Sequence, residues 1–447
     1  MSDTHRSVPN FVVDLDRPVS IRWKEICESY DSVWKKKLKP YVKGISKAFG
    51  EPEEVLAFVE TIKGIFSTRK EYRGYVDEIV AISRMSSALT VDELVLLHFM
   101  YEATQGCTAI LALEERTGKA VIGRTMDWSI PVLQELTIQV HFRRGGRILF
   151  TAPTWAGYVG ILTAVRPKDF AVAVNFRLSR TELADRMRIP RASPIGFIVR
   201  HVMETCDTYD SAVRLLAESP LLARAFFTIC DAESSGCVLS RTPTGEDARQ
   251  VLGPSAAKTG ITKRKAPFSG RQDGKRGKYS GGGAKESPGH RVSRYLVQAN
   301  LAHWVDSDRE DVQESLPRTR LVHAYVSERK RRLASDGTWK KKKNVTTTAI
   351  SEADVGTPEN CEARLGISEI WDLLGTYPIW ESGYSVYASV LSPFGIGTVE
   401  TRTPKEKEGD QRRFVFSETR ILPDRRAENT RGVMKKAREI GGRGRKS

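Results

Sequence analysis

The stretch QGCTAILALEERTGKAVIGRTMDW, residues 105–128, contains two strand-like runs separated by a turn. The runs CTAILALEE and KAVIGRTMDW are rich in Val, Ile and Leu, and RTG at their junction is a turn signal, so the stretch predicts a β-hairpin. An antiparallel return brings the end of the second strand beside the start of the first, so we expect Arg124 and Asp127 to lie next to Cys107. The hairpin therefore predicts both part of a sheet and a candidate reactive centre.

Cys107 follows Gly106 at the point where a helical pattern gives way to a strand. If the peptide bond between these residues is cut, Cys107 carries a thiol and a free α-amine, and both groups exchange protons close to neutral pH. A nearby guanidinium favours the thiolate, and a carboxylate can hold the ammonium. The spacing alone leaves open a second interpretation, in which Arg124 and Asp127 form a surface ion pair and Cys107 is a small core residue.

The order of predicted elements favours an α+β domain. Helical spacing, with a capping box of Thr90 and Glu93, predicts a small helical module in the first hundred residues after a short extended lead. Strand-like runs between residues 131 and 180 predict an antiparallel meander, residues 193–219 are helical, and strand patterns then return. Strands followed by helices and again strands indicate layered sheets and helices rather than a parallel βαβ sheet.

The positive charge of the chain is concentrated in three segments. The 447 residues carry a net charge of +16, whereas residues 258–291, 328–343 and 424–446 carry +8, +6 and +6, so the remainder is slightly acidic. We therefore predict basic insertions at about 254–292 and 328–365 and a basic disordered tail at 424–447. Such segments are candidates for binding an anionic membrane surface, with nucleic acid a less favoured partner and a solvated loop the commoner role.

Composition excludes several protein classes. Apolar stretches fall short of the roughly 18 residues that a membrane helix needs, and no secretory signal is visible, so the chain as written is expected to be cytosolic. The six cysteines include no CxxC pair, which argues against a zinc ribbon or a disulfide framework. We expect no metal and no cofactor.

Several blocks resemble a known family. The hairpin of residues 105–128, the GYVG segment, VQANLAHW, PRTR and YSVYASVLSPFGIGTVETR are similar, in order, to acid ceramidase and N-acylethanolamine-hydrolysing acid amidase, in the cholylglycine hydrolase branch of the N-terminal nucleophile hydrolases. The resemblance covers most of residues 10–400 outside the two insertions. It implies a four-layer αββα sandwich that cleaves itself before Cys107. Residues 1–106 would form a small helical N-terminal subunit, and residues 107–423 an amidase domain.

The resemblance also implies roles for individual residues. Cys107 would be the nucleophile, released by cleavage at Gly106–Cys107, with Arg124 and Asp127 matching the family's RxxD. Asn300 in VQAN matches an oxyanion-hole side chain, and Arg318 in PRTR matches a further active-site arginine. The remaining candidates, proposed to bind substrate, are Asn175, Trp128, Trp155 and Tyr158. The alternatives for these four are a satisfied strand-end asparagine and three core aromatics.

The activity that the resemblance implies is hydrolysis of a ceramide-type or N-acylethanolamine amide through a Cys107 thioester, giving a fatty acid and an amine. The alternatives are a bile-salt or penicillin-V-type amidase, an acyltransferase, or a non-catalytic relative that binds membranes or nucleic acid through its basic insertions. The segment VNFR departs from the family because Phe176 stands where a glutamate is proposed to assist self-cleavage. The family is lysosomal, which differs from the cytosolic expectation.

Overall fold

A computed structural model describes most of the chain outside the predicted insertions and tail. The described residues are 5–49, 59–60, 62–64, 69–99, 106–128, 130–177, 192–252, 295–300, 315–335, 364–380 and 385–404. Parts of the predicted helical module, residues 50–58 and 65–68, therefore lie outside them, as do the 254–292 insertion and the 424–447 tail.

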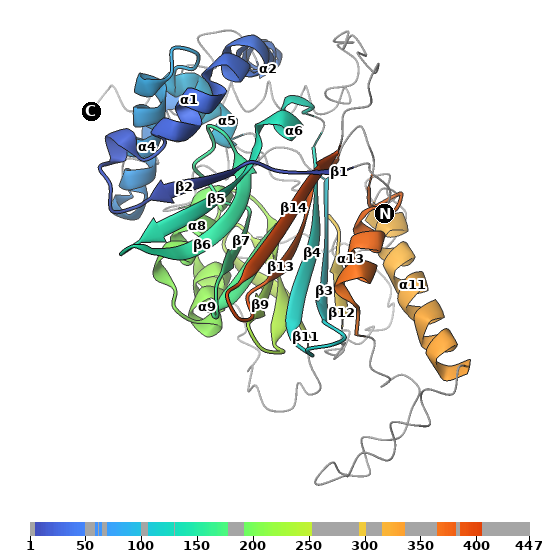
Figure 1. The fold of residues 1–447 in the computed structure, drawn as a ribbon. Coiled ribbons are helices and arrows are strands. Elements are labelled where there is room, and N and C mark those ends of the chain that lie inside the picture. The colour runs from blue at the N-terminus through green and yellow to red at the C-terminus, as the bar shows by residue number, and fades with distance from the viewer. Residues whose placement is uncertain are drawn as a thin grey trace, which may run out of the picture.

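Two sheets form the centre of the molecule (Figure 1). The described strands of the six-stranded sheet are, in spatial order, β1 (His5–Ser7), β14 (Thr398–Pro404), β13 (Ser385–Ser392), β4 (Ala120–Asp127), β3 (Gly106–Leu113) and β12 (Tyr295–Gln298). Those of the eight-stranded sheet are β11 (Gly245–Leu252), β10 (Gly236–Thr242), β9 (Ala225–Asp231), β8 (Phe170–Phe176), β7 (Thr163–Arg166), β6 (Arg147–Trp155), β5 (Thr137–Arg144) and β2 (Asn10–Asp14). All strand pairs are antiparallel except β2 with β5, so the predicted meander and hairpins are confirmed.

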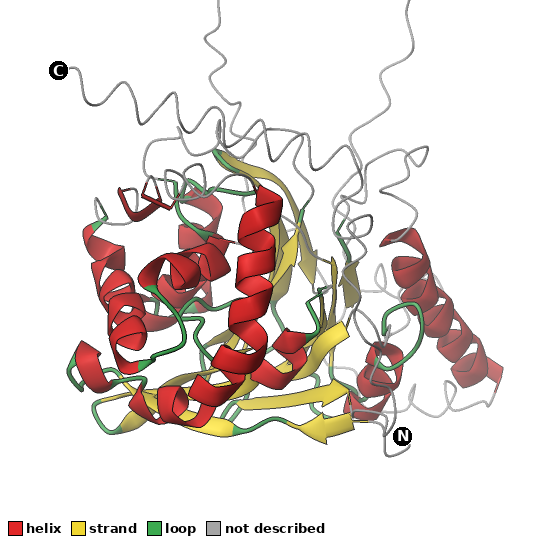
Figure 2. Ribbon diagram, turned by 90° about the horizontal axis from the view of Figure 1, so that it is seen from above, coloured by secondary structure: helices red, strands yellow, loops and turns green. Residues whose placement is uncertain are grey.

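Helices cover the outer faces of both sheets (Figures 1 and 2). The eight-stranded sheet is covered by α8 (Ile195–Thr205) and α9 (Tyr209–Glu218), and the six-stranded sheet by α11 (Ser315–Ser335) and α13 (Ile367–Leu374). Between the sheets, Leu111 and Ile122 pack against Ala173 and Phe226 in a buried cluster. The arrangement is the four-layer αββα sandwich that the resemblance implies.

The strands β3 and β4 are apolar on both faces because each face is covered. Residues Cys107–Leu113 and Ala120–Met126 are all buried, as expected of a strand pair with a sheet on one side and a helix on the other. Gly123 permits the close approach of α13, because a Cβ there would lie 2.4 Å from a methyl carbon of Ile370. This packing fixes the hairpin that carries Cys107.

The N-terminal segment is part of both sheets. Strand β1 pairs with β14, and β2 pairs in parallel with β5, so residues 5–14 extend one sheet and then the other. The helices that follow are α1 (Lys24–Val33), α2 (Lys39–Phe49), α4 (Arg73–Met85), α5 (Val91–Phe99), and a short π-helix (Trp34–Leu38) between the first two. The predicted capping box of α5 is present, since the Thr90 and Glu93 side chains each accept the other's backbone N–H.

The second basic segment begins inside a helix. The residues from 328 to 335 belong to α11, so the first part of the predicted insertion at 328–365 is helical. The net charge of this part of the chain is therefore carried partly by a helix that packs on the six-stranded sheet. The rest of the insertion up to residue 363 lies outside the described residues.

A buried ion-pair cluster joins the N-terminal helices to the later layers. The Glu78 carboxylate, which has no exposed surface, accepts two hydrogen bonds from the Arg200 guanidinium at 2.6 and 2.8 Å. It also accepts from Arg22 at 2.9 Å and from the Trp23 indole at 2.8 Å. Glu204 lies 2.8 Å from Arg200 on the same helix. The attraction offsets the desolvation of Glu78 and Arg200 only while both partners are present.

Replacing Glu78 by glutamine should lower the free energy of unfolding by about 3 kcal/mol, because the Arg200 charge would stay buried with one carboxylate fewer. Thermal or urea unfolding measures the change. The matched control is Glu28→Gln, since Glu28 pairs with Lys24 at 3.7 Å with both side chains more than half exposed. Glu28→Gln should lower the free energy of unfolding by less than about 1 kcal/mol. Equal effects of the two substitutions would contradict the prediction.

Candidate active site

The register of the β3–β4 hairpin sorts the predicted residues onto two faces. Cys107 pairs with Met126 and Ala109 with Arg124, so the Cys107 and Arg124 side chains are diagonal neighbours on the face toward the eight-stranded sheet. Asp127 pairs with Gly106 and therefore points to the opposite face. Arg124 therefore lies beside the thiol, whereas the Asp127 carboxylate lies on the opposite face of the hairpin.

Arg124 lies against the thiol. Its Nη2 donates to Cys107 Sγ over 3.3 Å and to the Val174 carbonyl over 2.6 Å, and both side chains are fully buried. Its Nη1 donates to the Leu162 carbonyl at 3.3 Å, the Tyr387 hydroxyl at 3.1 Å and the Thr163 hydroxyl. A guanidinium in contact with the sulfur stabilises a thiolate, which is the nucleophilic form of cysteine.

Asp127 is held by hydroxyl groups and an arginine on the outer face of the hairpin. Its carboxylate accepts from Ser385 Oγ at 2.8 Å and from Thr125 Oγ at 3.2 Å, and Arg318 Nη1 lies 3.4 Å away. Burial raises the pKa of Asp127 above its ordinary value, although Arg318, these hydroxyl groups and Arg124 oppose the shift. Asp127 therefore holds a proton to higher pH than a solvent-exposed aspartate.

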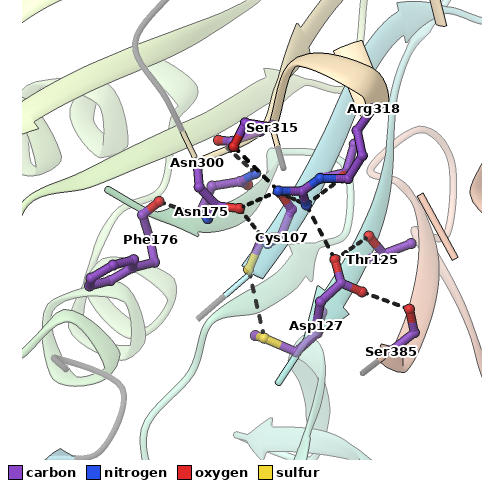
Figure 3. Close-up of polar contacts among 12 residues, drawn as sticks. Cys107, Thr125, Asp127, Asn175, Phe176, Asn300, Ser315, Arg318 and Ser385 are labelled. Carbon is purple, nitrogen blue, oxygen red and sulfur yellow. Dashed lines mark hydrogen bonds and ion pairs between the residues drawn. The ribbon is translucent and has the colours of Figure 1, made fainter. Parts of the chain in front are cut away.

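Asn300 and Arg318 bind the backbone of Cys107 (Figure 3). The Cys107 N–H donates to Asn300 Oδ1 at 2.9 Å, and Arg318 Nη1 donates to the Cys107 carbonyl at 2.8 Å. Arg318 Nη2 also donates to Asn300 Oδ1 at 2.9 Å. The five predicted catalytic side chains are thus brought together, although Asn300 Nδ2 donates to the Phe176 carbonyl at 2.8 Å. Its use as an oxyanion donor stays a prediction.

Asn175 supports this arrangement from the neighbouring sheet. Its Nδ2 donates to the Gln298 carbonyl at 2.8 Å, which fixes the residues just before Asn300. Its Oδ1 is buried and has no hydrogen-bond partner. Phe176, the next residue, uses only its carbonyl here, and Figure 3 shows its ring turned away from Cys107. A substrate-binding role for Asn175 stays a prediction, whereas its contact with the Asn300 segment is observed.

The three predicted substrate-lining aromatics form a buried series of rings. Trp155 makes edge contacts with Trp128 and Tyr158, each with ring centroids 5.5 Å apart, and lies 6.2 Å from the Tyr387 ring. All three are at most 5% exposed and belong to the core that also contains Cys107. The core role left open by the sequence is thus observed, and a role in lining an acyl channel stays a prediction.

Several contacts could not be found from the local sequence. Ser385, Tyr387 and Thr163 touch the predicted residues, yet each lies on a strand far from the hairpin in sequence. Only the pairing of β13 with β4 and the packing of the two sheets bring them there. The single available signal is the family-like block YSVYASV, which contains Ser385 and Tyr387.

The described residues contain no cluster of three or more His, Cys, Asp or Glu side chains arranged to hold a metal ion. Among the same residues, no helix is long and apolar enough to cross a membrane.

Two protein-family models match the chain. The model described as the beta subunit of N-acylethanolamine-hydrolyzing acid amidase matches residues 6–64, and the model described as acyl-coenzyme A:6-aminopenicillanic acid acyl-transferase matches residues 114–257. The two matches lie on opposite sides of the Gly106–Cys107 bond.

The chain is also similar to individual proteins of the same kinds. Acid ceramidase from Heterocephalus glaber is 29% identical over 258 residues, which are 52% of this chain and 63% of that protein. N-acylethanolamine-hydrolyzing acid amidase from Rattus norvegicus is 27% identical over 243 residues, 53% of this chain and 65% of that protein. The match thus spans just under two thirds of each relative. The solved structure of a Caenorhabditis elegans N-acylethanolamine-hydrolyzing acid amidase ortholog covers 64% of this chain and 93% of its own, with a TM-score of 0.40 and 19% identity.

Two facing sheets between helical layers, with a cysteine near the start of an inner strand, make this an α+β protein with the four-layer sandwich that the sequence resemblance implies. Over about half of its length the chain is similar to acid ceramidase and to N-acylethanolamine-hydrolyzing acid amidase.

The raised pKa of Asp127 predicts a pH-dependent stability. Because burial raises this pKa in the folded state, the native protein keeps a proton that the unfolded chain releases. The stabilisation by the protonated carboxyl is therefore lost as pH rises through the folded pKa. In a Cys107→Ala background, we expect Asp127→Asn to reduce the fall in Tm between about pH 4 and about pH 7.

The matched control is Asp31→Asn. The hydrogen bond from Lys35 holds the pKa of Asp31 below its ordinary value, so its contribution to stability is lost as the pH falls, the opposite sign. The same change in the pH dependence of Tm for both variants would contradict the assignment for Asp127.

Proposed function

We propose that this protein is a cysteine amidase that hydrolyses the N-acyl amide bond of a ceramide-type or N-acylethanolamine lipid. The observation that carries the proposal is the setting of Cys107. Its sulfur contacts the Arg124 guanidinium at 3.3 Å, while its nitrogen is bound to Asn300 and its carbonyl to Arg318. The thiol and the future α-amine thus each have a dedicated polar partner.

Self-cleavage comes first in the proposed sequence. The Cys107 sulfur attacks the Gly106 carbonyl carbon, a C–S bond forms, and the C–N bond to Cys107 breaks as its nitrogen takes up a proton. Water then hydrolyses the thioester and leaves a Gly106 carboxylate and a free Cys107. The departing nitrogen is already bound to Asn300 Oδ1 at 2.9 Å, so the new α-amine is held where it forms.

The catalytic cycle repeats this chemistry on a lipid. The Cys107 thiolate attacks the substrate carbonyl, and its own α-ammonium gives a proton to the leaving amine. Water hydrolyses the thioester to release the fatty acid. Arg124 stabilises the thiolate, and Arg318, itself paired with Asp127, orients the Cys107 backbone from the opposite face of the hairpin. The names of the acid ceramidase and N-acylethanolamine-hydrolyzing acid amidase relatives support the substrate class.

Acyl transfer is a second candidate function. Residues 114–257 match the acyl-transferase family model, and the Cys107 side chain is completely buried. A thioester formed at a thiol shielded from water would persist long enough for a second amine to attack it. Product analysis with a competing amine separates this reaction from hydrolysis.

Replacing Cys107 by alanine should abolish both self-cleavage and amide hydrolysis, because the alanine side chain has no nucleophilic group. We expect a single chain of about 50.0 kDa by intact mass and loss of fatty-acid release from a ceramide or N-acylethanolamine substrate. The control is Cys206→Ala, which removes a buried cysteine on the far side of the eight-stranded sheet. This variant should cleave itself and hydrolyse the substrate like the wild type. Cleavage and turnover by Cys107→Ala would overturn the proposal.

The two cleavage products should remain associated. Strands β1 and β2 pair within both sheets, and Glu78 binds Arg200 across the cleavage point in sequence, so separation would expose unpaired strands and a buried charge. Size-exclusion chromatography of cleaved protein should give one peak containing both fragments. Separate elution of residues 1–106 under non-denaturing conditions would contradict this.

A further inference from the structure

Two hydroxyl groups from different sheets meet at the Arg124 guanidinium. Arg124 Nη1 donates to the Thr163 hydroxyl and, over 3.1 Å, to the Tyr387 hydroxyl. The two hydroxyl oxygens lie 3.0 Å apart, so they also hydrogen-bond to each other. Thr163 belongs to β7 of the eight-stranded sheet and Tyr387 to β13 of the six-stranded sheet. The pair therefore binds the guanidinium from both sheets at once.

An irregularity in β13 aims Tyr387 at this point. Ser385 pairs with Asp127 and Tyr387 with Met126. Between these two pairs β13 has one extra residue and β4 has none, which is a β-bulge in β13. In a regular strand Ser385 and Tyr387 would point to the same face. The bulge instead sends Ser385 to the Asp127 carboxylate and Tyr387 to the thiol side, where Met126 and Cys107 lie.

The contacts leave the guanidinium little freedom. With Nη1 bound to the two hydroxyls and the Leu162 carbonyl, Nη2 is directed at the Val174 carbonyl and at Cys107 Sγ. Tyr387 is 1% exposed, and burial raises its pKa, so the hydroxyl keeps its proton and donates or accepts as a neutral group. Without the hydroxyl pair, Arg124 could turn its charge away from the sulfur.

We propose that Tyr387 and Thr163 are positioning residues that hold the Arg124 guanidinium against the Cys107 thiol and so set its reactivity. The proposal rests on the proposed function, in which Cys107 is the nucleophile. Neither hydroxyl is required to touch substrate. The charged and titratable groups around the thiol are Arg124 and Tyr387 on its own face, with Asp127 and Arg318 on the other face of the hairpin.

The test is the pH dependence of Cys107 alkylation by iodoacetamide in the full chain, followed by mass spectrometry of the Cys107 peptide. Tyr387→Phe and Thr163→Val each remove one hydroxyl with little change of shape. We expect the midpoint of the profile to move up by about one pH unit in Tyr387→Phe, with the rate near neutral pH about tenfold lower and the high-pH plateau unchanged. Thr163→Val should shift the midpoint in the same direction, and Thr163→Ser should restore it.

The matched controls remove equally buried hydroxyls elsewhere. Tyr72→Phe loses a hydrogen bond to Ser193 in the helical layer, and Thr137→Val loses one to the Leu133 carbonyl. Both should leave the alkylation profile unchanged. If Tyr387 and Thr163 were purely structural, all four variants would be less stable than the wild type, and none would shift the midpoint of the alkylation profile.

The outcomes separate this proposal from the proposed function. An unchanged midpoint in both Tyr387→Phe and Thr163→Val would overturn the positioning role, while self-cleavage lost on Cys107→Ala would still support the nucleophile. If Tyr387→Phe does not fold, Thr163→Val and its serine counterpart carry the test alone.

Discussion

The structure depends on the burial of one positive charge. Arg124 has no exposed surface, and its guanidinium bonds to a sulfur, two carbonyls and two hydroxyls that come from both sheets. A buried cation is tolerated only when its donors find acceptors. Because its acceptors come from both sheets, the packing of the sheets that binds the Arg124 guanidinium also places the Cys107 thiol beside it. The packing of the two sheets and the placement of the Cys107 site therefore depend on the same set of hydrogen bonds to Arg124.

The period of two in a β-strand divides the chemistry between faces. The thiol and its guanidinium lie between the sheets, where the surroundings are apolar and each hydrogen bond is strong. Arg318, which binds the Cys107 carbonyl, and Asp127, which contacts Arg318, lie on the helical side of the same hairpin. The Cys107 sulfur thus contacts Arg124 on one face of the hairpin, and the Cys107 carbonyl binds Arg318 on the other face, although both atoms belong to one residue.

Local patterns predicted what depends on neighbours in sequence. The hairpin, the proximity of Arg124 to Cys107 and the capping box of Thr90 were predicted from local patterns, and the structure has all three, although the register places Asp127 on the opposite face. The contribution of residues 5–14 to both sheets follows from no local pattern, because strand pairing at that distance depends on the whole sandwich. The bulge that aims Tyr387 is likewise invisible without the register of β13 against β4.

At position 176 the backbone carbonyl, rather than the Phe176 side chain, contacts the site. Strand alternation directs Asn175 toward Cys107 and its neighbour Phe176 away from it, as Figure 3 shows. A glutamate on this backbone would follow the same direction as the phenylalanine ring. The group that reaches the site from residue 176 is its carbonyl, which binds Asn300 Nδ2 and turns Oδ1 toward the Cys107 nitrogen. Any residue at 176 offers that carbonyl, so the orientation of Asn300 is independent of the departure from the family pattern.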